Sequence, residues 1–113
     1  MPGVSIHVVD VSRGVIASGM HVELYRGHAL VAGGAIGPNG LLEHPALRER
    51  FAADDYHAVF HVADYYRKAA VPIPPRPFLH VVRYDFGIDQ PDQHYHLPFK
   101  CTPWGYSCFR GGA

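Results

Sequence analysis

Glycine and proline interrupt this chain at short intervals, and their spacing is the feature that most restricts its fold. The 113 residues include 12 Gly and 10 Pro, and each of these weakens or breaks the interior of a helix. The segments between them are short and rich in β-branched and aromatic residues, which favour strands. The chain is therefore predicted to be an all-β protein, an antiparallel β-sandwich with one short helix.

The expected strands lie between these glycines and prolines. Val4–Val11 and Met20–Arg26 are predicted to pair as a hairpin, because the residues between them include Gly and Ser. A third strand over Ala29–Ile36 ends at an Asn-Gly pair, Asn39-Gly40, which is a strong turn signal. Later strands are expected at Tyr56–Val62, Phe78–Phe86, His94–Cys101 and Tyr106–Arg110.

Two segments are predicted to be helical, and one to be an extended connector. Pro45–Ala53 begins with a proline that suits the first turn of a helix. Ala63–Ala70 is expected to form the short helix, which ends before Val71-Pro72. Four prolines between positions 72 and 77 then exclude regular strand pairing.

Size and charge exclude several classes of partner. Residues 1–113 are too few for two hydrophobic cores, so a single domain is expected. Ten Lys and Arg balance ten Asp and Glu, which argues against nucleic-acid and membrane partners. Met1–Asp10 does not read as a targeting segment, so a cytoplasmic location is expected. Cys101 and Cys108 form no CxxC pair and are expected to be ordinary strand side chains in a reducing compartment.

Three of the nine histidines are candidate functional residues. His94 and His96 are two apart on an expected strand, so both imidazoles project from one face and can transfer protons or bind a ligand. A solvated face without a chemical role is the alternative for this pair, and a structural hydrogen bond is the alternative for His7. The three imidazoles together would suit zinc, but no Cys or carboxylate spacing supports such a site, so no cofactor is expected. GxSxG, P-loop, GxGxxG and HExxH motifs are absent.

The carboxy-terminal run carries a longer signature. Residues 89–112 read DQPDQHYHLPFKCTPWGYSCFRGG. This run resembles the terminal signature of the transthyretin-like proteins, whose enzymatic members are 5-hydroxyisourate hydrolases. Ile6–Asp10 and Val22–Arg26 are similar to the first two strands of that family, and Tyr56–Tyr66 is similar to its later strand and helix. The resemblance therefore covers nearly the whole chain.

The resemblance implies an eight-stranded antiparallel β-sandwich and a homotetramer, a dimer of dimers with its active sites at the dimer–dimer interface. It also implies roles for individual residues. His7 and His96 would form a catalytic proton-transfer pair, and Arg110 and Gly111 would belong to a substrate-binding tail. His94 would support this pair or hold a metal ion.

Three positions differ from the family pattern. Leu41 stands where the family has an arginine, Phe109 replaces a tyrosine and Gly112 replaces a serine. These changes predict a less polar substrate site that is wider near the tail, and the loss of one guanidinium that would stabilise a developing oxyanion. Arg48 or Arg50 could supply the guanidinium instead.

Three functions fit these observations. The first is hydrolysis of 5-hydroxyisourate in purine breakdown, without a cofactor. The second is a diverged relative that hydrolyses, opens, cyclises or isomerises another small cyclic molecule. The third is a small-ligand binding protein without catalytic activity.

Overall fold

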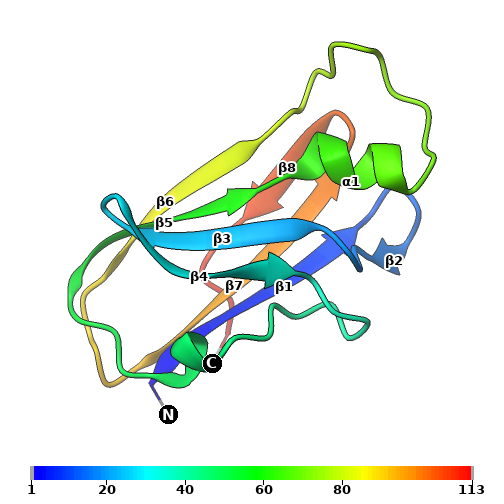
Figure 1. Cartoon of the computed structure of the whole chain (residues 1–113). Coiled ribbons are helices and arrows are strands. Elements are labelled where there is room, and N and C mark those ends of the chain that lie inside the picture. Colours follow the sequence, from blue (N-terminus) through cyan, green and yellow to red (C-terminus); the bar gives the residue numbers. More distant parts are fainter. Residues whose placement is uncertain (1, 113) are drawn as a thin grey trace.

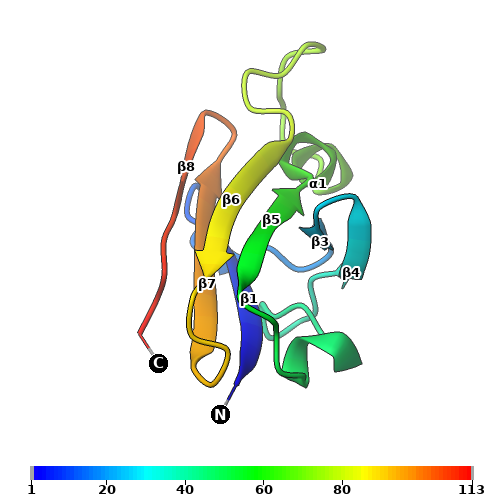
Figure 2. The same ribbon diagram turned by 90° about the vertical axis from the view of Figure 1, so that its left-hand side faces the viewer.

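Two four-stranded sheets pack face to face in the computed structural model, which describes residues 2–112 (Figures 1 and 2). The first sheet has the order β2-β1-β7-β8 and the second has the order β4-β3-β5-β6. The first sheet comprises β1 (Gly3–Asp10), β2 (Val15–Ile16), β7 (His94–Thr102) and β8 (Gly105–Cys108). The second comprises β3 (His21–Arg26), β4 (Ala29–Ala35), β5 (Asp54–Phe60) and β6 (Val82–Ile88). This arrangement confirms the predicted all-β, transthyretin-like eight-stranded sandwich.

Short helical segments lie outside the sheets. A 3₁₀ turn, η1 (Pro45–Arg48), lies between β4 and β5, and the helix α1 (Val62–Lys68) lies at one end of the sandwich (Figure 1). The proline-rich segment after α1 has no regular structure until Val82, as its composition predicts. No described helix is long and apolar enough to cross a membrane.

The predicted hairpin between the first two long strands is wrong. β1 pairs antiparallel with the two-residue strand β2 and parallel with β7 along its whole length. β3 belongs to the other sheet, where it pairs with β4 and β5. Residues 11–20 are long enough to cross between the sheets, so the chain that follows β1 is not confined to a tight hairpin.

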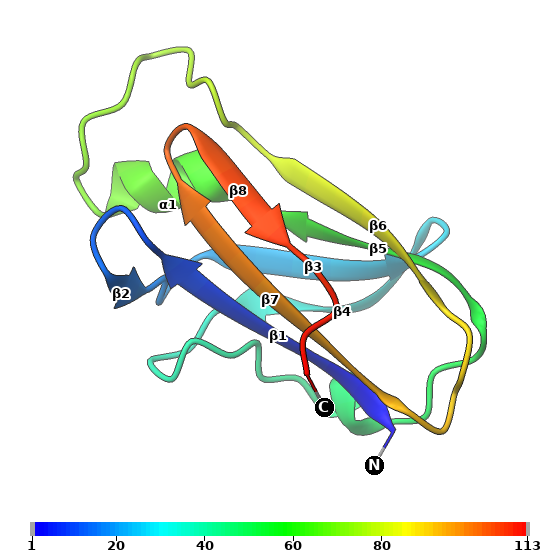
Figure 3. The same cartoon turned by 180° about the vertical axis from the view of Figure 1, so that it is seen from behind.

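Two strands begin or end at residues other than those predicted. β6 begins at Val82 rather than Phe78, because its partner β5 ends at Phe60, which pairs with Val82. β8 ends at Cys108 rather than Arg110. The tail nevertheless stays beside β7, since the N–H of Gly111 donates to the carbonyl of His96 over 2.7 Å. Figure 3 shows this tail continuing past β8 toward the N-terminal end of β1.

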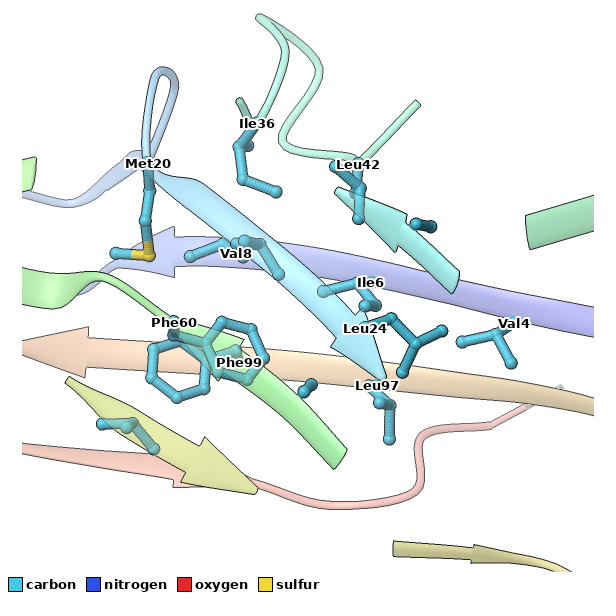
Figure 4. Close-up of a cluster of buried hydrophobic side chains, with 14 of the residues drawn as sticks. Val4, Ile6, Val8, Met20, Leu24, Ile36, Leu42, Phe60, Leu97 and Phe99 are labelled. Carbon is cyan, nitrogen blue, oxygen red and sulfur yellow. The ribbon is translucent and has the colours of Figure 1, made fainter. Parts of the chain in front are cut away.

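Alternating side chains of both sheets form one core (Figure 4). Val4, Ile6 and Val8 face inward from β1. Phe60 of β5 and Phe99 of β7 stack across the sheets with ring centroids 3.8 Å apart. Because the apolar half of β1 and β7 faces this core, the polar half is fixed on the outer face of the first sheet.

Candidate active site

The candidate histidines lie together on the outer face of the first sheet. On β1, Ser5 and His7 alternate with buried residues, and on β7 His94 and His96 do the same. The parallel register pairs Ser5 with His96. His7 is two residues further along β1, which places its Cα about 8 Å from that of His96 by strand spacing and rise. The structure therefore brings the predicted proton-transfer pair to adjacent strands of one surface.

Ser5 links the two histidines of β7. Its Oγ lies 2.8 Å from Nε2 of His94 and 2.6 Å from Nδ1 of His96. His94 Nδ1 lies 3.4 Å from the carbonyl of Pro2, and a carbonyl can only accept, so in neutral His94 this is the nitrogen that carries the proton. It follows that Ser5 donates to His94 and accepts from Nδ1–H of His96. The remaining nitrogen of His96, Nε2, is left with a lone pair.

The surroundings of His96 favour its neutral form. Burial lowers the pKa of His96 below the ordinary histidine value, and His7 and His94 lower it further because two positive charges close together repel. A neutral imidazole with a free Nε2 can accept a proton at neutral pH. The hydrogen bonds thus determine which nitrogen of neutral His96 carries the proton, and the lowered pKa favours that neutral form.

The Asn39-Gly40 turn completes one side of the site. Its continuation pairs with the edge of β1: His7 and Leu41 form an antiparallel bridge, and Val8 N–H donates to the Gly40 carbonyl over 2.9 Å. Directly opposed residues share one face of a sheet, so Leu41 flanks His7. Gly40 has φ of 84°, and a Cβ there would lie 2.5 Å from Nε2 of His7. Glycine is required at this position for both reasons.

The tail covers the opposite side of the site. A Cβ on Gly111 would lie 2.7 Å from Cδ2 of His96, so the backbone of the tail packs directly on the imidazole. Arg110 does not share that surface. Its guanidinium stacks 3.9 Å above the ring of Tyr95 and donates to Oε1 of Gln93 and to the carbonyl of His94. Tyr95 points to the face of β7 opposite His94 and His96, so Arg110 anchors the tail in this structure.

Phe109 and Gly112 are the remaining predicted positions of the tail. Phe109 is 47% exposed and its ring lies 5.8 Å from Nζ of Lys100. A Cβ on Gly112 would have no atom within 4 Å. The predicted site residues therefore divide: His7 lies against Leu41 and His96 against Gly111, whereas Phe109 lies against Lys100 and the side of Gly112 is open.

A hollow of about 270 Å³ opens beside this surface. Ser5, Leu41, His94 and Arg48 are among its lining residues. Arg50 instead pairs with Asp92 over 3.0 Å. Of the two arginines that could replace the missing guanidinium, Arg48 is thus the one near the site. It makes a 3.6 Å ion pair with Glu43, and its side chain is 76% exposed, so it is free to move.

Ser5 was not predicted as a site residue, and Arg48 was predicted only as an alternative to Arg50. Ser5 precedes His7 by two positions on an alternating strand, and that spacing alone could have placed it on the same face. Arg48 could not be placed without the path of the loop after β4. The suggested zinc site of His7, His94 and His96 has no geometric support, because within residues 2–112 the three donors that approach within 4.8 Å of one another belong to other residues.

Comparison with known proteins places the chain in a family. The model of the HIUase/Transthyretin family matches residues 4–111. A protein of Rhizobium meliloti named 5-hydroxyisourate hydrolase 2 is 39% identical over 110 residues, which are 93% of this chain and 92% of that protein. The 5-hydroxyisourate hydrolase of Pseudomonas aeruginosa is 36% identical, over 98% of this chain and 92% of that one.

Structures of two other proteins have a similar fold. A crystal structure of (S)-allantoin synthase superposes with a TM-score of 0.89 at 33% identity, covering 97% of this chain and 43% of that chain. The 5-hydroxyisourate hydrolase of Klebsiella pneumoniae superposes with a TM-score of 0.82 at 25% identity, covering 99% and 100% of the two chains. With its sequence matched from the first strand to the tail, this chain belongs to the HIUase/Transthyretin family.

Proposed function

We propose that the protein is a cofactor-independent hydrolase of the 5-hydroxyisourate type, which opens a cyclic amide with a pair of histidines. The observation that carries the proposal is the hydrogen-bond chain from Pro2 through His94 and Ser5 to His96. This chain leaves Nε2 of His96 free to accept a proton. The names of the relatives supply the substrate class.

In the proposed reaction, His96 removes a proton from water as the water oxygen attacks the carbonyl carbon of the ring. The C–N bond of the ring then breaks, and the departing nitrogen takes a proton from His7. One water is consumed, and a carboxylic acid and an amine-type nitrogen are formed. Ser5 and His94 hold the proton of His96 on Nδ1 during the attack, so that Nε2 is the nitrogen that acts.

A second candidate function is the same chemistry on a less oxygen-rich ring. The observation that favours it is the position of Leu41, which stands opposite His7 where the family pattern has an arginine. An apolar side chain cannot hydrogen-bond a ring carbonyl or stabilise an oxyanion, and losing one such donor costs roughly a hundred- to a thousandfold in rate. Arg48 lines the same hollow as Leu41 and can bind an anionic ring substituent.

Ultraviolet monitoring of freshly generated 5-hydroxyisourate tests the first candidate. The wild-type protein is expected to accelerate the decay of this compound, and His7→Ala and His96→Ala are each expected to lower kcat/KM by about a hundredfold or more. The exposed His28, in the turn between β3 and β4, provides the matched control His28→Ala. The acidic limb of the pH profile should lie below the ordinary histidine value, because the lowered pKa keeps His96 neutral there.

The possible outcomes separate the two candidates. Full activity in both histidine variants would eliminate the proposed mechanism. No acceleration by the wild-type protein would eliminate 5-hydroxyisourate as the substrate and leave the diverged relative, whose substrate can be sought among other cyclic amides. Genes for purine breakdown next to this one would favour the first candidate, and a biosynthetic cluster would favour the second.

The proposal extends to assembly and location. We infer a homotetramer whose sites are shared between subunits, because the surface with His7 and His96 lies on an open sheet face with a shallow hollow rather than in an enclosed pocket. β6 and β8 also have unpaired outer edges on the same side of the sandwich (Figure 2). Both cysteines are free thiols, which suits a cytoplasmic location.

A further inference from the structure

A second cluster of polar side chains lies on the opposite outer face of the sandwich. His21 and Glu23 are two apart on β3, so both project outward from the second sheet. His61 directly follows β5, the antiparallel neighbour of β3, and its N–H donates to the carbonyl of His21 over 3.1 Å. The pairing of these strands therefore fixes His61 beside the other two residues.

The side chains converge on one point. Nε2 of His61 lies 3.0 Å from one carboxylate oxygen of Glu23, and Nε2 of His21 lies 3.4 Å from the other. The two imidazole centroids are 5.3 Å apart, and the donor atoms of all three residues lie within 4.8 Å of one another. A zinc ion held about 2.0–2.1 Å from each donor requires neighbouring donors about 3.3 Å apart in a tetrahedral site. The two histidine–carboxylate separations are close to this value, and the two imidazole nitrogens lie within 4.8 Å of each other.

The charge of Glu23 is not balanced by a basic side chain. Its side chain is 22% exposed, and no Lys or Arg in residues 2–112 forms an ion pair with it. Its charged partners are the two histidines, which carry a positive charge only when protonated. When the two imidazoles carry no proton charge, the half-buried carboxylate between them has a negative charge to offer to a cation.

The cluster also has access to solvent on one side. A hollow of about 380 Å³ is lined by His21, Glu23, Gly34 and His44, among others. His44 is not a fourth ligand as it stands, because its Nδ1 accepts the N–H of Ala46 over 3.1 Å. The open side can hold a water molecule in the remaining coordination position.

We propose that His21, Glu23 and His61 form a zinc-binding site. Two neutral imidazoles and one carboxylate are a donor set that zinc accepts with a fourth position open. The ion would bind Nε2 of each histidine, whose proton moves to Nδ1, and one oxygen of Glu23. It would join β3 to the residue that precedes α1, on the face of the sandwich away from His7 and His96.

Calorimetric titration of the chelator-treated protein with zinc chloride tests the proposal. We expect one saturable equivalent in the wild-type protein, a rise in Tm on binding, and a loss of affinity of at least about tenfold in both Glu23→Gln and His61→Ala. His57→Ala is the matched control, because His57 lies on β5 and stacks on Tyr25 of β3, outside the cluster. Cobalt in place of zinc should show the visible absorption of a tetrahedral site.

Variants of the two sites distinguish zinc binding by this cluster from zinc binding by the candidate active site. His96→Ala should bind zinc as the wild type does, and binding that disappears in His96→Ala but persists in His61→Ala would assign the ion to the other face and overturn the proposal. Absence of saturable binding in the wild type would overturn it as well. Glu23→Gln retains the shape of the side chain, and circular dichroism of each variant confirms that a loss of binding is not a loss of folding.

Discussion

At the scale of single residues, the site depends on two glycines that have no side chain to contribute. Gly40 allows the turn to reach Nε2 of His7, and Gly111 allows the tail to lie on His96. Each imidazole is thus held between backbone atoms and the sheet. Because these two glycines have no side chain, the backbone can pack against the imidazoles and fix the orientation of the proposed acid and base.

This close contact predicts a specific effect of Gly111→Ala. The new Cβ would lie 2.7 Å from Cδ2 of His96 and 3.1 Å from Cδ of Pro98, so the ring or the tail must shift. A displacement of about 1 Å at a reacting group can cost roughly a hundredfold in rate, and we expect kcat to fall by about that factor in the proposed reaction. Steady-state kinetics measures the effect, while Tm reports on the fold.

Gly112→Ala is the matched control, because a Cβ there would meet no atom within 4 Å. Its kcat should equal that of the wild type. Equal rates in both alanine variants would show that the tail does not position His96.

Sequence reasoning found the histidines but not their partners. The spacing of His94 and His96 places them on one face wherever the strand lies, because a strand alternates with a period of two. The link through Ser5 depends on the parallel register of β1 with β7, and residues 89 positions apart carry no local sign of that pairing. Arg110 was expected to bind substrate, and its stacking on Tyr95 likewise depends on a contact that spacing does not encode.

At the scale of elements, strand positions could be predicted better than strand partners. Alternation of apolar residues marks β1, β3 and β5 in the sequence, and the structure confirms strands there. Alternation does not say which strand lies next to which, so the expected hairpin of β1 with β3 was wrong. β6 begins opposite the end of β5, and β8 ends where its next partner on β7 would be Pro98, which has no N–H to donate. The local sequence of β6 and β8 contains neither fact.

One buried charge joins several elements. Asp10, at the end of β1, is fully buried. Its carboxylate accepts hydrogen bonds from Ser12, Arg13 and the hydroxyls of Tyr65 and Tyr66, both on α1. Burial alone would raise the pKa of Asp10, but these hydrogen bonds outweigh it and lower the pKa.

Replacing this carboxylate should destabilise the fold in a pH-dependent way. We expect Asp10→Asn to lower the free energy of unfolding by about 3 kcal/mol at pH 7, because Arg13 and the two tyrosines lose their charged acceptor. A lowered folded-state pKa stabilises the protein above the unfolded value of about 3.9 and ceases to do so as the pH falls through the folded value. The difference from the wild type should therefore shrink in acid.

Urea denaturation between neutral and acid pH measures this difference. The exposed Asp85, which pairs with Arg83 over 2.9 Å, gives the control variant Asp85→Asn, expected within about 0.5 kcal/mol of the wild type. A difference for Asp10→Asn that stays constant across the pH range would mean that the charge of Asp10 is not what stabilises this junction.

At the scale of the whole molecule, the two outer faces of the sandwich have different chemistry. The first sheet presents His7, Ser5, His94 and His96, and the second presents His21, Glu23 and His61 with Tyr25 stacked on His57. The core between them is apolar and continuous. Of the nine histidines in this neutral chain, one group lies on each outer face of the sandwich. The family resemblance marks only the group with His7, His94 and His96.

The edge strands of this small domain can mediate its assembly. β6 and β8 each have one unpaired edge on the same side, so two copies can extend both sheets by pairing edge to edge. Two such dimers can then close over the face with His7 and His96, which one chain leaves open. Sedimentation should give a mass about four times the 12.5 kDa of the chain. Ser107→Lys, exposed on β8, should lower this mass, because like charges would meet across the paired edges.

The proposed sharing of sites gives this variant a second consequence. If subunits complete one another's sites, Ser107→Lys should lose activity in parallel with its mass, although Ser107 is not itself one of the candidate site residues. Ala35→Lys places the same charge on β4, an edge strand of the other side, and should retain both mass and activity. A wild-type protein that sediments as a monomer with full activity would contradict the shared site, and the hollow beside Leu41 and Arg48 would then have to hold the substrate within a single chain.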